Sequence, residues 1–217
     1  FVVHAPELFE NSELLDLASP DKDYRKRSIK NMQRVIDLTL KLKKYFPSTD
    51  TPMIVTNIGG FSMDKNFTNA EVKSGYKIFC QSLDELNTDG VELIPQTMAP
   101  YPWHFGGQRL QNLFVHPDEI IHWCQQLNLR MCFDISHSML TSNNFGYCFY
   151  DLCEQIAPHT AHLHIGDAKG LNGEGLQIGD GSIDFDKVGK ILKSLAPSAT
   201  FIPEIWQGHK NDGEGFW

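Results

Sequence analysis

The stretch MCFDISH at residues 131–137 decides the fold, because it joins a short apolar run to polar residues placed directly after it. Four other runs end in the same way: FVVHAP from residue 1, VELIPQT from 91, AHLHIGD from 161 and FIPEIW from 201. From VELIPQT onward the polar ends stand at positions 96, 134, 164 and 204, which are 38, 30 and 40 residues apart. Each interval fits one strand followed by one helix.

The apolar runs predict six strands, over residues 1–5, 53–58, 90–95, 130–135, 161–165 and 200–205. Short, continuous runs of this kind are typical of buried parallel strands. Between them, helical periodicity predicts helices over 25–46, over 70–87 with Asn69 as cap, from Pro117 onward, and after a cap at Asp184. The alternation favours an α/β fold with a parallel sheet, and a (β/α) barrel would gather the strand ends around one pocket.

Composition favours one domain over residues 1–217, with an ordinary hydrophobic content of 41%. A net charge of −8 argues against broad binding of nucleic acid, which needs clustered basic side chains. Five cysteines without a Cys-x-x-Cys pair favour a reduced, cytoplasmic protein, and no apolar run is long enough to span a membrane. Because the chain opens with Phe1 in a strand-like run, we expect its natural beginning to be missing.

Three side chains at strand ends are candidate metal ligands: Asp134, His164 and Glu204. A buried carboxylate needs a partner, and neutral imidazole is a common ligand of transition metals. Simpler roles stay open: Asp134 as a cap of the following segment, His164 as a structural histidine, and Glu204 in an ordinary salt bridge. Gln96 would offer a fourth ligand through its neutral carbonyl oxygen, but it cannot act as a general base.

Further residues are candidates for contact with a substrate. His137 follows Asp134 by one turn, and the Pro- and Gly-rich stretch 95–109 is long enough to shape a pocket. The Gly-rich tract 166–181 is typical of a mobile loop and lacks a dinucleotide-binding pattern. From these segments and their surroundings we expect contacts with a substrate from His4, Trp103, His104, Phe105, Lys169, Glu174 and His209.

At these motifs the chain resembles the xylose isomerase-like barrel superfamily, which includes sugar isomerases, ketose 3-epimerases and endonuclease IV-type enzymes. The motifs span the whole chain, and their joint order is more specific than any one of them. They are His-Ala-Pro-x-Leu at 4–8, Asn-x-Gly-Gly-Phe at 57–61, Asp-x-x-His at 134–137, His-x-x-Asp-x-Lys at 164–169, Ile-Gly-Asp-Gly-x-Ile-Asp-Phe at 178–185 and Pro-Glu at 203–204.

The resemblance implies that Asp134, His164 and Glu204 bind the shared divalent metal of the family (Mn, Co, Mg or Zn), with His137 as a nearby site histidine. Gln96 stands where the family usually has a fourth ligand, a glutamate. The six strands would match the third to eighth of a barrel, so the first two would be absent. His4 matches a zinc-binding histidine of the endonuclease branch, but Asn57 stands where another is expected, which argues against a nuclease.

The sequence therefore favours an enzyme, a metal-dependent sugar or sugar-phosphate isomerase/epimerase that acts through a metal-stabilised enediolate. Glu204 would ligate the metal and shuttle the proton, and His137 would assist. The molecule that it binds would be a small sugar or sugar phosphate. Assembly of the chain into a homo-oligomer is left as an open alternative. The main alternative is a catalytically impaired sugar-binding barrel, or an accessory domain of a larger protein, because Gln96 removes one acid/base group. A metal-dependent lyase or hydrolase, or an abasic-site endonuclease, is the third.

Overall fold

The computed structural model describes residues 1–104 and 107–216, so Phe105 lies outside the described residues. The chain forms two compact units: Phe1–Gln96 with Pro102–Leu113, and Thr97–Tyr101 with the residues from Phe114 onward. The single domain over residues 1–217 remains a prediction.

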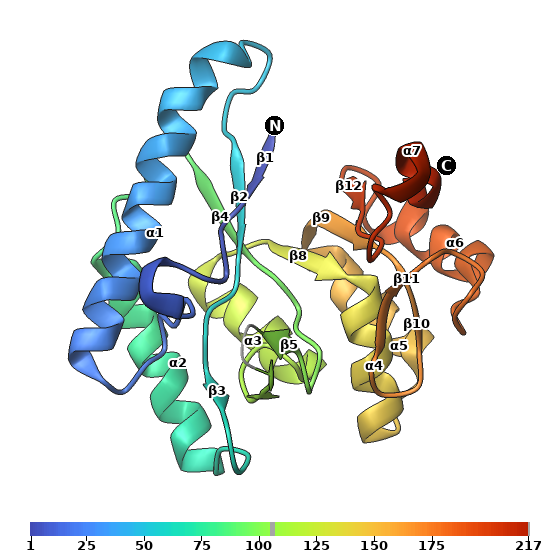
Figure 1. Ribbon diagram of the computed structural model, residues 1–217, viewed down its shortest axis with the longest axis horizontal. Helices are drawn as coiled ribbons and strands as arrows, with labels where there is room; N and C mark the ends of the chain where they lie inside the picture. The colour runs from blue at the N-terminus through green and yellow to red at the C-terminus, as the bar shows by residue number, and fades with distance from the viewer. Residues whose placement is uncertain (105–106, 217) are drawn as a thin grey trace. The chain divides into compact units, whose positions relative to one another are not determined.

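The first unit is built on a parallel sheet of three strands in the order β1-β2-β4. These strands are β1 (Val2–His4), β2 (Met53–Thr56) and β4 (Glu92–Pro95). Their register places Val3 beside Ile54 and Ile54 beside Leu93. The helices α1 (Lys22–Leu42) and α2 (Asn69–Asp84) lie on one side of these strands (Figure 1). All three strands point the same way, so their carboxyl ends lie at one edge of the sheet.

Both helices of the first unit begin at a side-chain cap. The carboxylate of Asp21 accepts hydrogen bonds from the backbone N–H groups of Asp23 and Tyr24, so α1 begins three residues before the predicted start at 25. For α2 the predicted cap was wrong. Thr68 caps the helix in a capping box with Glu71, and Asn69 is already its first residue. Both predicted helices exist, but each ends before its predicted bound: α1 ends at Leu42 and is followed by the single turn η2 (Lys43–Tyr45), and α2 ends at Asp84 rather than at residue 87.

Short elements complete the first unit. One antiparallel pair joins β3 (Phe61–Ser62) to β7 (Leu110–Gln111), and another joins β5 (Trp103–His104) to β6 (Gly107–Gln108). A single turn of 3₁₀-helix, η1, covers Glu10–Ser12. The Pro- and Gly-rich stretch after β4 therefore contains a small hairpin.

The second unit holds another parallel sheet of three strands, in the order β12-β9-β8. They are β8 (Met131–Asp134), β9 (Thr160–Ile165) and β12 (Thr200–Pro203). The helices and 3₁₀ turns of this unit are α3 (Pro117–Leu127), α4 (Ile135–Phe145), α5 (Phe149–Ile156), η3 (Ala157–His159), α6 (Phe185–Leu195), α7 (Lys210–Gly213) and η4 (Glu214–Phe216).

All six predicted strands are therefore confirmed, and so are the helix start at Pro117 and the cap at Asp184. The Gly-rich tract 166–181, predicted to be a mobile loop, is in part an antiparallel hairpin of β10 (Asp167–Lys169) and β11 (Gly173–Leu176). Residues 177–181 contain no helix or strand, and the mobility of the tract remains a prediction. The six parallel strands of the described residues are fewer than the eight that close a barrel.

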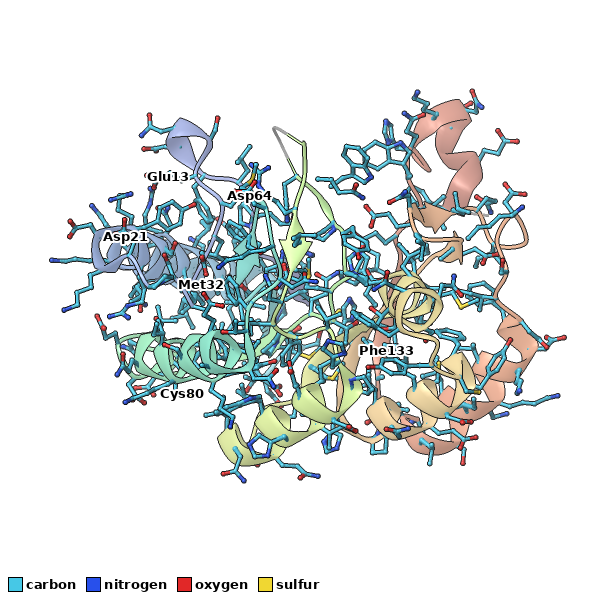
Figure 2. All side chains as sticks on the ribbon, turned by 90° about the horizontal axis from the view of Figure 1, so that it is seen from below. Glu13, Asp21, Met32, Asp64, Cys80 and Phe133 are labelled. Atoms are coloured by element: carbon cyan, nitrogen blue, oxygen red, sulfur yellow. The ribbon has the colours of Figure 1, made fainter. Side chains whose placement is uncertain are left out.

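Each unit has its own apolar core. Met32 of α1 is fully buried in the first unit, and Phe133 of β8 is fully buried in the second; both are labelled in Figure 2. Within residues 1–104 and 107–216, no helix combines the length and apolar character needed to cross a membrane.

Candidate metal centre

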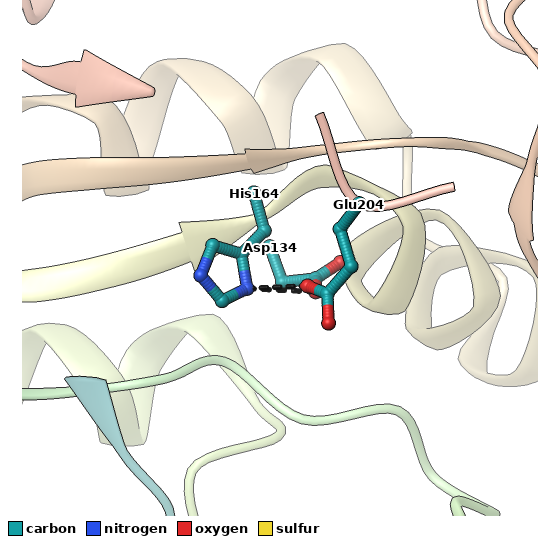
Figure 3. A group of neighbouring side chains, drawn as sticks. All are labelled: Asp134, His164 and Glu204. Atoms are coloured by element: carbon teal, nitrogen blue, oxygen red, sulfur yellow. Dashed lines mark ion pairs between the residues drawn. The ribbon is translucent and has the colours of Figure 1, made fainter. Parts of the chain in front are cut away.

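Asp134, His164 and Glu204 converge at the carboxyl ends of the three strands of the second sheet. Asp134 is the last residue of β8 and pairs in register with His164 of β9. Ile202 of β12 pairs with His164 on the other side, and Glu204 follows two residues later. One potential ligand atom of each side chain lies within 4.8 Å of those of the other two. Figure 3 shows the two carboxylates directed at the same edge of the imidazole ring.

Asp134 is fixed from two sides. Its Oδ1 accepts a hydrogen bond of 2.8 Å from the backbone N–H of His137, so Asp134 caps α4. Its own backbone N–H donates to Oγ1 of Thr97 at 2.9 Å. The capping role suggested by the sequence and the role of a candidate ligand thus coexist, because a carboxylate has two oxygens. The cap uses Oδ1, while Oδ2 lies 3.7 Å from Nδ1 of His164.

His164 is the electrostatic centre of the cluster. Its Nδ1 lies 2.5 Å from Oε2 of Glu204, whose backbone N–H is held at 2.8 Å by the carbonyl of Ile165. Burial acts to lower the pKa of His164, but hydrogen bonds to Asp134, Cys132 and Glu204 outweigh it and raise this pKa to about 12. Without a cation, the imidazole therefore holds two protons, and its charge balances part of the charge on the carboxylates.

His137 lies beside the cluster, and its role there remains a prediction. Its Nδ1 lies 3.0 Å from the carbonyl oxygen of Thr97 and 3.3 Å from Oδ2 of Asp134, and its Nε2 lies 3.7 Å from Glu174. Burial opposes protonation of His137, but the charges of Asp134, Glu174 and Glu204 raise its pKa. For Asp134 burial acts to raise the pKa, yet His137 and His164 lower it on balance. The carboxylate is thus held in its charged form.

The donor set fits a divalent cation. Two carboxylate oxygens and one imidazole nitrogen are ligands that Mn²⁺, Co²⁺ and Zn²⁺ accept, and the carboxylates also suit Mg²⁺. Asp134 and His164 are buried, whereas the side chain of Glu204 is 53% exposed, so the site can be reached from solvent. No other group of three such donors lies this close together within residues 1–104 and 107–216.

The other predicted site residues fall in both units. In the first unit, Nε2 of His4 lies 3.0 Å from Oε1 of Gln96, Trp103 is exposed, and the side chain of His104 is buried. In the second unit, Lys169 and His209 are exposed, on the β10–β11 hairpin and just before α7. Their contacts with a substrate, and the ligand role of Gln96, remain predictions.

Asp167 has a structural role that the sequence analysis missed. Its buried carboxylate accepts hydrogen bonds from the backbone N–H groups of Ala168, Gly179, Gly181 and Ile183. The segment after β11 is thereby tied back to β10. A Cβ atom at Gly181 would lie 2.2 Å from Oδ1 of Asp167, so only glycine fits there. The glycines that donate to it lie 12 and 14 residues further along the chain, so no local pattern in the sequence indicates this role.

Comparison with known proteins places these features in a family. The model of the family described as xylose isomerase-like TIM barrel matches residues 1–216. An uncharacterised protein of Methanocaldococcus jannaschii is 27% identical over 186 residues, which cover 83% of this chain and 63% of that protein. A probable endonuclease 4 of Natronomonas pharaonis is 26% identical over 190 residues, which cover 82% of this chain and 62% of that protein. The chain thus spans about three fifths of these two curated relatives.

Among solved structures, a D-tagatose 3-epimerase-like protein superposes with a TM-score of 0.67 at 22% identity, covering 95% of this chain and 71% of that one. An L-ribulose 3-epimerase superposes with a TM-score of 0.65 at 16% identity, and the match covers 88% of this chain and 58% of that one. These matches confirm the predicted barrel-type fold.

Proposed function

Because the chain belongs to the xylose isomerase-like TIM barrel family, we propose that it is a metal-dependent sugar or sugar-phosphate isomerase/epimerase. The observation that carries the proposal is the convergence of Asp134, His164 and Glu204 at the ends of three adjacent parallel strands. Ketose epimerases share the fold, so ketoses are the first substrates to test.

Asp134, His164 and Glu204 would hold the divalent cation, with Gln96 as a further ligand. A cation there would act as a Lewis acid on the adjacent carbonyl and hydroxyl oxygens of an open-chain sugar. Asp134 and His164 are buried, and a backbone N–H group holds the Asp134 carboxylate, so they would position the cation with little reorganisation. Such rigid placement suits a reaction in which charge develops on a substrate oxygen.

Glu204 would move the proton. Its side chain is half exposed, so a substrate can reach it, unlike Asp134. The carboxylate would take a proton from the carbon next to the carbonyl; return of a proton to the neighbouring carbon gives the isomer, and return to the opposite face of the same carbon gives the epimer. His137, whose raised pKa keeps it a hydrogen-bond donor, would orient a substrate oxygen, with the exposed side chains of Lys169 on β10 and His209 before α7 as further contacts.

The test is turnover by the full-length protein loaded with Mn²⁺ or Co²⁺. Incubation with D-fructose, D-tagatose and L-ribulose in D₂O, followed by NMR, detects both epimerisation and exchange of the carbon-bound proton. We expect Glu204→Gln to lower the rate about 100- to 10,000-fold, the range for loss of a general acid/base. Asp186→Asn, an exposed acid on α6, is the matched control and should keep the rate. Absence of both turnover and exchange would refute the proposal.

A second candidate function is sugar binding without catalysis. It is supported by the contact between His4 and Gln96, in which the neutral amide stands where the family usually has a glutamate. One acid/base group of the usual pair is then lost. Saturable ketose binding by the metal-loaded protein, together with no proton exchange in D₂O, would favour this function. A third candidate function, that of an abasic-site endonuclease, is tested by incision of abasic DNA, since some relatives are named as probable endonuclease 4.

A further inference from the structure

The imidazole of His164 makes contacts beyond those with the two carboxylates of the metal centre. Its Nδ1 lies 2.5 Å from Oε2 of Glu204 and 3.7 Å from Oδ2 of Asp134. The ring also hydrogen-bonds to the thiol of Cys132. Figure 3 shows the second ring nitrogen pointing away from both carboxylates. Because the carboxylates occupy Nδ1, Nε2 is the ring nitrogen left for the sulfur of Cys132.

Cys132 lies on the face of the sheet that carries the metal centre. It stands two residues before Asp134 on β8, and alternate residues of a strand project from the same face. Its register partner on β9 is His162, which in turn stands two residues before His164. The side chain of Cys132 is completely buried, so bulk water does not reach the sulfur. The thiol is therefore a fixed partner of the His164 ring.

His162 packs against the same ring from a further side. The two imidazole centroids are 5.4 Å apart and the ring planes are nearly perpendicular, at 88°, which is a favourable edge-to-face arrangement. His162 is itself anchored, because its Nδ1 lies 2.7 Å from Oγ1 of Thr200 on β12. The ring plane of His164 is thus set by packing, and its two nitrogens face different partners.

The hydrogen bond to sulfur has a direction. Without a cation the His164 ring holds two protons, so the ring donates and the sulfur of Cys132 accepts. A neutral imidazole that binds a cation keeps one proton, and the hydrogen bond made by the other nitrogen decides which nitrogen binds. Histidine ligands usually donate this second N–H to a carboxylate, a backbone carbonyl or water. Here a buried sulfur stands in that place.

We propose that Cys132 is a positioning residue of the metal centre: its sulfur accepts the proton on Nε2 of His164 and so leaves Nδ1 to bind the cation. Nδ1 is also the nitrogen that faces Asp134 and Glu204, so the three donor atoms are directed at one point. The inference rests on the metal centre of the proposed function. It does not depend on which reaction the centre supports.

The experiment compares substitutions at Cys132 in the metal-free full-length protein. Cys132→Ala removes the acceptor, whereas Cys132→Ser keeps one. Cys153→Ala, at another completely buried cysteine of the second unit, is the matched control. Calorimetry with Co²⁺ should show affinity lowered about 10- to 100-fold in Cys132→Ala, recovered to within about threefold in Cys132→Ser and unchanged in Cys153→Ala. Both alanine variants lose buried volume, so similar midpoints of thermal unfolding would separate the loss of affinity from a loss of stability.

Two spectra distinguish positioning from other roles. Long-range ¹H–¹⁵N correlation in the Zn²⁺-loaded protein reports which nitrogen of His164 carries the proton, and we expect Nε2. The visible spectrum of the Co²⁺-loaded protein reports direct coordination by sulfur, through a thiolate-to-cobalt charge-transfer band. We expect no such band that disappears in Cys132→Ala, because the sulfur of Cys132 contacts the ring and not the cation.

The proposal is overturned if Cys132→Ala binds Co²⁺ as tightly as the natural sequence, if the His164 proton lies on Nδ1, or if Cys132 itself ligates cobalt. Should Cys132→Ala not fold, Cys132→Val fills the space without an acceptor and carries the same comparison with Cys132→Ser. Failure of the natural sequence to bind any cation would sink this proposal together with metal dependence. Cation binding without ketose turnover or proton exchange would refute the proposed function alone.

Discussion

Asp134 and His164 occupy the same register position on the adjacent parallel strands β8 and β9, and Oδ2 of the first lies 3.7 Å from Nδ1 of the second. Neighbouring strands of a sheet are about 5 Å apart, so side chains in register on one face meet without help from any loop. The position of these two candidate ligands is therefore fixed by the sheet itself. Only Glu204, just beyond β12, depends on a turn.

The first prediction concerns loss of a ligand. Asp134→Asn replaces a charged oxygen donor by a neutral amide, so we expect the affinity for Mn²⁺ or Co²⁺ to fall by at least about 100-fold. Isothermal titration calorimetry of the metal-free protein measures this. Asp186→Asn should leave the affinity unchanged. Equal affinities of Asp134→Asn and the natural sequence would show that the cation, if it binds, binds elsewhere.

The second prediction concerns protons. The pKa of His164 is about 12 in the metal-free protein, so between pH 6 and 8 the ring carries a proton that a cation must displace. Metal affinity should therefore rise about tenfold per pH unit, with about one proton released per cation. Calorimetry in buffers of different ionisation enthalpy counts that proton. Affinity that does not change between pH 6 and 8 would contradict the assignment of His164 as a ligand.

The strands and the convergence of Asp134, His164 and Glu204 were predictable because the sequence signals for them are local. Most strands are continuous apolar runs, and each candidate ligand lies within one residue of the end of one: Asp134 ends β8, His164 is the penultimate residue of β9, and Glu204 follows β12. The helix α4 was missed because the side chains that it buries include Ser138, Thr141 and Ser142, which give no apolar stripe. Their hydroxyl groups are satisfied inside the fold; Ser142, for example, donates to the carbonyl of Ser138. Apolar periodicity cannot detect a helix whose buried face is polar.

Contacts between side chains that are distant in sequence were the other feature that could not be predicted. Nδ1 of His104 lies 3.2 Å from Oε2 of Glu7, although the two residues are far apart in sequence and nothing in the residues around either one indicates the other. The same holds for Asp167, whose carboxylate is buried by backbone N–H groups 12 to 16 residues further on. Such pairs follow from how the loops fold back, which no periodicity records.

The third prediction concerns the stability provided by Asp167. Asp167→Ala leaves the N–H groups of Ala168, Gly179, Gly181 and Ile183 without the fully buried carboxylate that accepts their hydrogen bonds. We expect a loss of about 3 to 5 kcal/mol in the free energy of unfolding, as for other broken buried networks. Chemical denaturation measures it, with Asp186→Ala as a control that should cost less than about 1 kcal/mol. A loss as small as that of the control would mean that the carboxylate does not organise the segment.

The fourth prediction restores a carboxylate at position 96. Gln96→Glu would place a charged oxygen beside Nε2 of His4, where the amide oxygen now lies at 3.0 Å. If the chain is a catalyst that has lost one acid/base group, this substitution should raise both metal affinity and ketose epimerisation by at least about tenfold. Gln111→Glu, a change of the same chemistry in the first unit, is the control and should raise neither. No gain in either quantity would favour the function of sugar binding without catalysis.

The last prediction concerns Asp16, a buried carboxyl group of the first unit. Burial raises its pKa to about 7, although hydrogen bonds from the N–H groups of Gly60 and Ala18 act in the opposite direction. In the unfolded chain the pKa returns to its ordinary value near 3.8, so the folded state binds the proton more tightly. The stability that this proton provides is complete below about pH 4 and is lost as the pH rises to about 7. The loss is on the order of a few kcal/mol.

Asp16→Asn has no proton to lose, so the difference in unfolding free energy between the two proteins should shift in favour of the variant over this range. Denaturant titrations at pH 4, 5.5 and 7.5 measure the shift, and a constant difference at all three values would show that Asp16 is charged in the folded protein.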